Sequence, residues 1–117
     1  MNTNEKVKQK SEHLEQVEFV SWFRKNYHPT HRVFAIPHGG LRSKGVAMSL
    51  KAEGATAGVP DLMIPSLGVF IEMKKEKGGK VSPEQMEWLD YLTSVGYYTK
   101  VCNGCEEAKQ FVLSIIK

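Results

Sequence analysis

The sequence has no apolar run long enough to cross a membrane, and only two of its 117 residues are cysteine. A membrane-spanning helix needs about 20 consecutive apolar residues, so a membrane protein is not expected. The N-terminal stretch MNTNEKVKQKSEH is polar and lacks the apolar segment of a signal peptide. The chain is long enough to bury a hydrophobic core without disulfides. We therefore expect one cytoplasmic domain, in which residues 1–10 form a flexible polar lead and residues 11–117 fold.

The two cysteines stand in the short motif C-N-G-C, at Cys102 and Cys105. Thiols at this spacing occur in redox proteins and in zinc sites, and His28 and His31 supply an H-x-x-H. Neither half of this pattern is long enough to identify a zinc finger, and nothing else in the sequence follows the redox pattern. Two reduced cysteines near the end of a strand are expected, with a zinc or redox protein as an alternative.

Hydrophobic periodicity and helix-capping residues predict the element order α-β-α-β-β-α-β-α. Helices are expected at residues 11–27, 43–52, 83–95 and 106–116, and strands at 32–36, 61–64, 69–74 and 97–102. The short link 65–68 implies an antiparallel hairpin. Residues 75–81, with two glycines and three lysines, are expected to form a flexible basic loop. The order predicts an α/β fold with one mixed β-sheet flanked by helices.

The predicted hairpin carries charged residues inside apolar runs. Asp61 follows Pro60 into one strand, and Glu72 and Lys74 interrupt the next. Charge in a strand that packs on a core is costly unless it is paired or binds an ion. Because residues i and i+2 of a strand share a face, Glu72 and Lys74 point the same way and Met73 points into the core. Asp61 can approach Glu72 across the hairpin.

Two carboxylates brought together repel, unless a divalent cation lies between them. Mg²⁺ prefers oxygen ligands and often binds a few carboxylates together with water and a substrate phosphate. A nearby lysine can then hold or deprotonate a metal-bound water, as in sites that cleave phosphodiesters. Two structural alternatives remain open. Asp61 could cap a turn after Pro60, and Glu72 with Lys74 could be an ion pair on an exposed edge strand.

A mild excess of positive charge accompanies this stretch. The formal net charge is +3 and the pI about 8.9, which permits a polyanionic partner without requiring one. Cationic residues lie on both sides of the hairpin and within it: Arg42, Lys44, Lys51, Lys74, Lys75, Lys77 and Lys80. Such residues usually form a solvated face, but here they flank the candidate site.

The motifs G-V-P-D at 58–61, I-E-M-K at 71–74 and S-P-E-Q at 82–85 resemble the PD-(D/E)xK nuclease superfamily. More closely, they are similar to its VRR-NUC branch, of the small stand-alone type found in phages and bacteria. The resemblance extends over nearly the whole chain and includes the loop I-P-H-G-G-L-R and the strand G-Y-Y-T-K-V-C. It implies a restriction-endonuclease-like core of helix, three strands, helix and strand, with Mg²⁺ or Mn²⁺ as the cofactor. A phage-encoded member would work in the cytoplasm of a bacterial host cell.

The resemblance implies roles for the charged residues of the hairpin. Asp61 and Glu72 would be the carboxylates that bind the metal, and the backbone carbonyl of Met73 would be a further ligand. Lys74 would orient or activate the attacking water and stabilise charge in the transition state.

Two further catalytic residues are implied outside the hairpin. Glu15, in the motif L-E-Q, matches the acid on the family's first helix and would also bind the metal, with Glu18 one turn on as the competing residue. A solvated glutamate face is the structural alternative. Gln85 matches the family's glutamine near the site, but in S-P-E-Q the same side chain could instead complete a capping box.

Contacts with nucleic acid are expected from the basic segments. Arg42 and Lys44 can reach phosphates from a helix start, and Lys77 and Lys80 can clamp DNA. The family loop often carries Asn before Gly-Gly, where this chain has His38, which could touch a phosphate or a base. For each lysine, plain solvation is the alternative.

Together these features predict a Mg²⁺- or Mn²⁺-dependent endonuclease that hydrolyses phosphodiester bonds in DNA. Small members of the family resemble Holliday-junction resolvases in acting as homodimers. We therefore expect a homodimer and a branched DNA substrate, recognised by its shape rather than by its base sequence. No membrane partner is expected. The alternative is a non-catalytic nucleic-acid-binding accessory module on the same fold.

Overall fold

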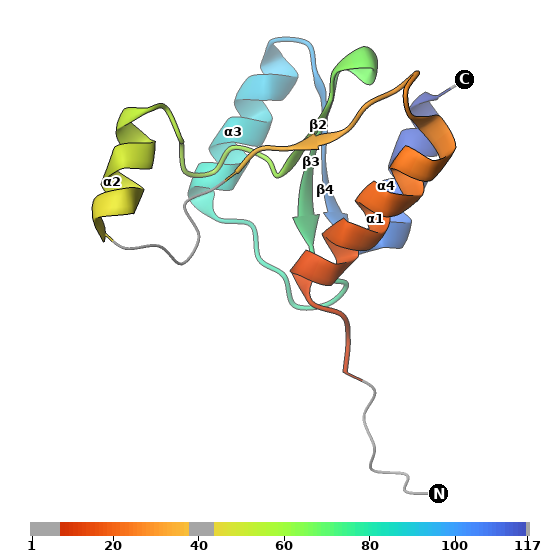
Figure 1. Cartoon of the computed structure of the whole chain (residues 1–117), viewed down its shortest axis with the longest axis horizontal. Coiled ribbons are helices and arrows are strands. Elements are labelled where there is room, and N and C mark those ends of the chain that lie inside the picture. Colours follow the sequence, from red (N-terminus) through yellow and green to blue (C-terminus); the bar gives the residue numbers. More distant parts are fainter. Residues whose placement is uncertain (1–7, 38–43, 117) are drawn as a thin grey trace, which may run out of the picture.

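The helices and strands follow the order that the sequence predicts. The computed structural model describes residues 8–37 and 44–116. The elements in this part of the chain (Figure 1) are α1 (Glu12–Tyr27), β1 (Phe34–Ala35), α2 (Lys44–Ala52), β2 (Leu62–Ile64), η1 (Pro65–Leu67), β3 (Val69–Lys74), α3 (Pro83–Ser94), β4 (Tyr98–Asn103) and α4 (Cys105–Ile115). The short link of the predicted hairpin forms the 3-10 turn η1.

The four strands form one mixed sheet in the order β1-β2-β3-β4. Strands β2 and β3 are antiparallel, with Leu62 opposite Ile71, which confirms the predicted hairpin. Strand β4 runs parallel to β3, because α3 crosses over between them. As a result β3 lies inside the sheet, and all six of its residues are buried.

Helices cover both faces of this sheet, with α1 and α4 on one face and α3 on the other (Figure 1). The main hydrophobic core lies on the α1 and α4 face, where Phe19 and Phe23 of α1 pack with Val112 of α4 and with alternate residues of β3, including Met73. Burial on both faces explains why the sequence of β3 is a nearly continuous apolar run. The opposite face of β3 carries Glu72 and Lys74, as the alternation of a strand requires.

Three strands differ from their expected bounds. Strand β2 begins at Leu62 rather than at Asp61. Strand β1 is shorter than 32–36 because only Phe34 and Ala35 pair with the three-residue strand β2. Tyr97 is not the first residue of β4, because its N–H donates instead to the carbonyl of Leu92 and closes the end of α3, at 3.0 Å.

Helix α2 stands apart from the packed helices (Figure 1). Its side chains Val46 and Met48 are 45% and 63% exposed. The segment that follows α2 returns to the body at Gly58, whose φ is +89°. A Cβ at Gly58 would lie 2.6 Å from the backbone C and O of Glu84, so only glycine fits this contact with the start of α3.

The cysteines are buried and carry free thiols. Burial raises the pKa of the Cys102 thiol to about 12, so it is not a reactive thiolate. Within the described ranges, the one group of His, Cys, Asp and Glu side chains placed to hold a metal contains neither cysteine. His31 hydrogen-bonds with the hydroxyl of Ser66 at 2.7 Å. This arrangement favours reduced structural cysteines over a zinc or redox centre.

No helix in the described part of the chain combines the length and the apolar character that a membrane span needs.

Substitution of Gly58 by alanine is expected to destabilise the protein more than substitution of Gly54. Both glycines have positive φ, at +89° and +107°, so alanine at either site costs roughly 1–2 kcal/mol in backbone conformation. Only at Gly58 does the new Cβ also collide with backbone, which adds on the order of 1–3 kcal/mol. Denaturant unfolding of Gly58→Ala and Gly54→Ala measures the difference, and equal losses would contradict the close approach to α3.

Candidate active site

Three carboxylates from three different parts of the chain meet at the open end of the β2–β3 hairpin. Glu12 lies in the first turn of α1, Asp61 directly precedes β2, and Glu72 lies in β3. One carboxylate oxygen from each lies within 4.8 Å of the other two. The register that pairs Leu62 with Ile71 places Asp61 opposite Glu72, as the hairpin predicted. Oxygen donors at this spacing are suited to a divalent cation.

The Glu72 carboxylate is the most deeply buried of the three, with 1% of its surface exposed. Burial, together with the nearby charge of Asp61, raises its pKa to about 8 against the opposing effect of Lys74. Its Oε1 atom is buried and meets no hydrogen-bond donor among the described residues. A buried carboxylate oxygen without a donor is costly, so this atom favours a proton or a bound cation beside it.

The exposed edge-strand alternative for Glu72 and Lys74 is wrong. The strand that carries them lies between β2 and β4, and the two side chains are 1% and 8% exposed. The Nζ of Lys74 is 3.7 Å from Oε2 of Glu72. The pair is therefore an internal part of the carboxylate site.

Gln85 makes the contacts of a helix cap and also lies beside the carboxylate site. Its backbone N–H donates to Oγ of Ser82 at 3.1 Å, and its Oε1 accepts from the backbone N–H of Ser82 at 2.9 Å, which completes a capping box at the start of α3. The same Oε1 accepts from Nζ of Lys74 at 3.0 Å, and Nε2 donates to Oε2 of Glu72 at 3.1 Å. One side chain thus caps the helix and joins the lysine to the buried carboxylate.

Asp61 also bonds to the backbone of β3. Its Oδ2 accepts from the N–H of Met73 at 2.7 Å. In a strand the N–H and C=O of one residue point to the same side, so the Met73 carbonyl also faces the β2 side. The register continued by two residues places Pro60 opposite Met73, and proline has no N–H to donate to that carbonyl. This geometry suits the expected role of the Met73 carbonyl as a further metal ligand.

The structure does not bring Glu15 or Glu18 to the cluster, and Glu12 takes the place expected of them. Glu15 is 3% exposed, and its Oε1 accepts from the backbone N–H of Cys105 at 3.0 Å, at the start of α4. Glu18 forms an ion pair with Lys10 at 2.7 Å. The sequence shows acids at 12, 15 and 18 in one helix, but periodicity alone does not say which turn of the helix lies over the site.

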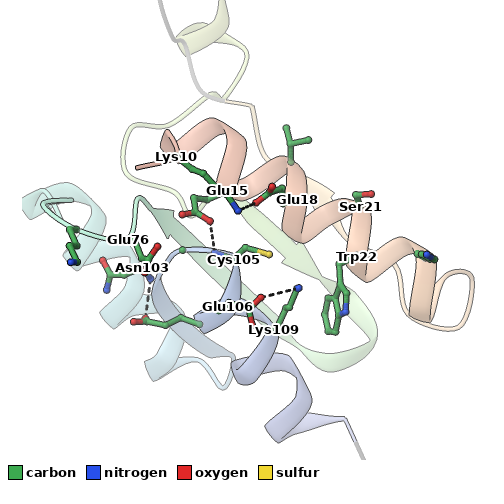
Figure 2. A pocket seen from close by; sticks show the side chains of 15 residues that line it. Lys10, Glu15, Glu18, Ser21, Trp22, Glu76, Asn103, Cys105, Glu106 and Lys109 are labelled. Carbon is green, nitrogen blue, oxygen red and sulfur yellow. Dashed lines mark hydrogen bonds and ion pairs between the residues drawn. The ribbon is translucent and has the colours of Figure 1, made fainter. Parts of the chain in front are cut away.

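Glu15 and Glu18 instead line a second groove of about 810 Å³ between α1 and the start of α4, shown in Figure 2. Two ion pairs line it, one between Lys10 and Glu18 at 2.7 Å and one between Lys109 and Glu106 at 3.1 Å. Lys109 also lies over the ring of Trp22, 5.5 Å from the ring centre. The carboxylate cluster lines a different groove, of about 800 Å³, which includes Gln85.

The basic loop after β3 is held at two points, although a flexible loop was expected. The side chain of Gln9 accepts from the N–H of Lys77 at 3.1 Å and donates to its carbonyl at 3.0 Å. At the second point, Gly79 lies against the stem of Lys74, where an added Cβ would be 2.9 Å from the Cβ of that lysine. Lys77 and Lys80 are both exposed.

The other expected nucleic-acid contacts fall outside what the structure describes. His38 and Arg42 lie outside the described residues, and Lys44 begins α2 without a described side chain.

Comparison with known proteins agrees with this geometry. A family model of the VRR-NUC domain matches residues 3–106. A solved structure described as a VRR_NUC domain protein has a TM-score of 0.77 and 23% sequence identity, and the match covers 93% of this chain and 90% of that chain. None of the curated proteins matches. The fold is therefore the restriction-endonuclease-like α/β fold that the sequence predicted.

The raised pKa of Glu72 predicts how the stability of the metal-free protein depends on pH. In the folded state Glu72 holds its proton up to about pH 8, and in the unfolded state its pKa is near the ordinary 4.5. The free energy of unfolding should therefore decrease as pH rises from about 4.5 to about 8. Glu72→Gln is neutral in both states and lacks this loss, so it should be more stable than wild type at pH 8 by roughly 1–3 kcal/mol.

Thermal unfolding in EDTA at several pH values checks this prediction. All other titrating groups are common to both proteins, so the difference between them isolates Glu72. Parallel curves for the two proteins would show that the pKa of Glu72 is not raised.

Proposed function

Because this chain belongs to the VRR-NUC family of nuclease domains, we propose that its carboxylate cluster is the active site of a metal-dependent DNA endonuclease. The observation that supports this proposal most directly is the buried Oε1 of Glu72, which meets no donor and lies in a group of three carboxylates. A site that only bound nucleic acid would gain nothing from this arrangement, since the carboxylates repel phosphate.

The residues present fit a small divalent cation. Glu12, Asp61 and Glu72 would hold it, and the backbone carbonyl of Met73 faces the same side of the hairpin. All these donors are oxygens, which favours Mg²⁺ or Mn²⁺ over zinc. When bound, the cation would supply Lewis-acid stabilisation of a phosphate oxygen and a water of lowered pKa.

Lys74 is the cationic group of the mechanism. It is buried, and Gln85 and Glu72 hold its ammonium group at 3.0 and 3.7 Å. A fixed ammonium group in a site shielded from water can orient the attacking water and stabilise the charge that develops on the phosphate in the transition state. Gln85 is the positioning residue, since it bonds to both Lys74 and Glu72.

The substrate that we propose is branched DNA, cut by a homodimer. Each chain provides one cluster, and symmetric cutting of two strands needs two active sites. Lys77 and Lys80, with Arg42, Lys44 and His38, would contact the sugar-phosphate backbone, which fixes position without reading sequence. Selectivity would then come from the shape of the DNA.

Loss of the Lys74 ammonium group should abolish cutting while leaving DNA binding largely intact. Lys74→Ala is expected to reduce kcat on the order of 10²–10³-fold, because a fixed donor to the transition state is lost. Cleavage of a labelled four-way junction, flap, duplex and single strand in Mg²⁺, Mn²⁺ or EDTA measures this, with binding measured in parallel.

Lys100→Ala is the matched control, because Lys100 is exposed on β4 and outside the groove of the cluster. Glu72→Ala controls for contaminating nucleases. Cutting by Lys74→Ala at the wild-type rate would refute the assigned role. Tight binding without cutting by wild type in any metal would identify an accessory module instead.

Metal binding should depend on Glu12 and not on Glu15. Mn²⁺ at 100 times its Kd would stabilise the wild-type protein by about 2.7 kcal/mol. Glu12→Gln should weaken metal affinity roughly tenfold or more, because a charged ligand is lost. Glu15→Gln keeps a carbonyl that can accept from Cys105, and its metal affinity should be unchanged. Calorimetric titration of Mn²⁺ into both variants measures the metal affinity. A loss of affinity in Glu15→Gln alone would show that Glu15 is the metal ligand, as the sequence predicted.

A further inference from the structure

The groove that contains the carboxylate cluster has a second wall with a different chemical character. Glu12, Asp61, Glu72 and Gln85 form one side of this space of about 800 Å³. The other side comes from the end of α2 and the segment after it, with Leu50, Lys51, Ala55, Thr56, Ala57 and Gly58.

The second wall carries small side chains where it follows the end of α2. From position 55 to position 58 the sequence reads A-T-A-G, so no side chain here is larger than threonine. The hydroxyl of Thr56 donates back to the carbonyl of Gly54 at 2.9 Å, and the close contact between Gly58 and Glu84 fixes the path of the segment. Small residues on a fixed segment allow a polymer backbone to approach the carboxylates closely.

Lys51 is the cationic side chain that lines this groove within the described part of the chain. It lies in the last turn of α2, where a cation interacts favourably with the helix dipole. The helix end is closed by hydrogen bonds from Ala55 N–H to the Leu50 carbonyl at 2.9 Å and from Gly54 N–H to the Lys51 carbonyl at 3.1 Å. The backbone of Lys51 is therefore fixed across the groove from the acids.

Two independent features of the groove thus indicate a ligand. Among the described residues, a buried carboxylate oxygen on one side meets no donor, and Lys51 stands on the wall of small residues on the other side. A ligand that fits both sides of the groove must be narrow and negatively charged. It must contact the carboxylates through a bound cation, because the carboxylates themselves repel an anion. A single strand of nucleic acid has this chemistry, since it presents successive phosphates on a thin backbone.

We infer that the wall formed by residues 51–58 is a substrate subsite, which rests on the nuclease function proposed above. It holds the sugar-phosphate backbone beside the phosphate that is cut. Lys51 binds a neighbouring phosphate, and Ala55 and Ala57 leave room for the backbone between this contact and the carboxylates. The end of α2 thereby sets the direction in which the substrate strand crosses the site.

Lys51 is tested by DNA binding in a Glu72→Gln background, which lacks a central carboxylate and prevents cutting from disturbing the measurement. Lys51→Ala should weaken binding several-fold at low salt and reduce the slope of log Kd against log salt concentration by about 0.9, the value for one phosphate contact. Lys51→Glu should weaken it further. Lys100→Ala removes the same charge outside the groove, and equal effects of Lys51→Ala and Lys100→Ala on affinity and slope would overturn the inference.

The small-residue wall is tested by filling it. Ala57→Trp should reduce both DNA affinity and cleavage, whereas Ala52→Trp, at an exposed position that does not line the groove, should reduce neither. Stabilisation of Ala57→Trp by Mn²⁺ should equal that of wild type, which shows that the protein is folded and the cluster intact. Wild-type DNA affinity in Ala57→Trp would overturn the subsite.

Competition distinguishes a strand subsite from a simple phosphate site. A short single-stranded oligonucleotide should compete with labelled DNA for the wild-type protein, and less effectively for Lys51→Ala. Inorganic phosphate at equal phosphate concentration should compete poorly, and equal competition by phosphate would overturn the strand subsite. If wild type binds DNA through Lys51 but never cuts, the nuclease function fails and the subsite stands. If wild type cuts and both variants match their controls, the subsite fails and the function stands.

Discussion

The burial of the Glu72 carboxylate in the central strand is the constraint on which the rest of the site depends. With helices on both faces of the strand, this carboxylate is almost fully buried and its charge is poorly solvated, and Asp61 lies directly opposite. Only one of the two carboxylate oxygens of Glu72 is stabilised by described side chains. Gln85 and Lys74 interact with Oε2, and Oε1 has no donor among the described residues. A proton or a cation beside Oε1 would therefore stabilise this site.

The backbone of the β2–β3 hairpin also shapes the carboxylate site. Pro60 has no N–H to donate to the Met73 carbonyl, which faces the β2 side of the strand where Asp61 lies. The Asp61 carboxylate accepts from the N–H of Met73, where a strand carbonyl would otherwise accept. The dipeptide Pro60-Asp61 therefore ends the strand pairing and brings a carboxylate next to Glu72. This explains in physical terms why a proline precedes the acid.

The sequence was sufficient for the hairpin and for the meeting of Asp61, Glu72 and Lys74, because strand alternation and a short link determine which side chains face one another. It could not identify Glu12, since helical periodicity defines a face of α1 but not which turn of that helix lies next to Asp61 and Glu72. It also could not reveal that Gln9 holds Lys77 from 68 residues away, because neither residue belongs to a periodic pattern. Gln85 was left as a choice between cap and site, because the sequence gives no sign that one amide can serve both.

That double use of Gln85 links the charge of the site to the first turn of α3. The amide oxygen that bonds to Lys74 also accepts from the N–H of Ser82, and the amide nitrogen contacts Glu72. A change in the proton or cation beside Glu72 changes the hydrogen bonds of the Gln85 side chain. Because the same side chain accepts from the N–H of Ser82, the electronic environment of the helix start changes as well. The backbone amides of Ser82 and Gln85 therefore form an internal spectroscopic probe, whose nitrogen chemical shifts follow the state of the buried carboxylate without any added label near the site.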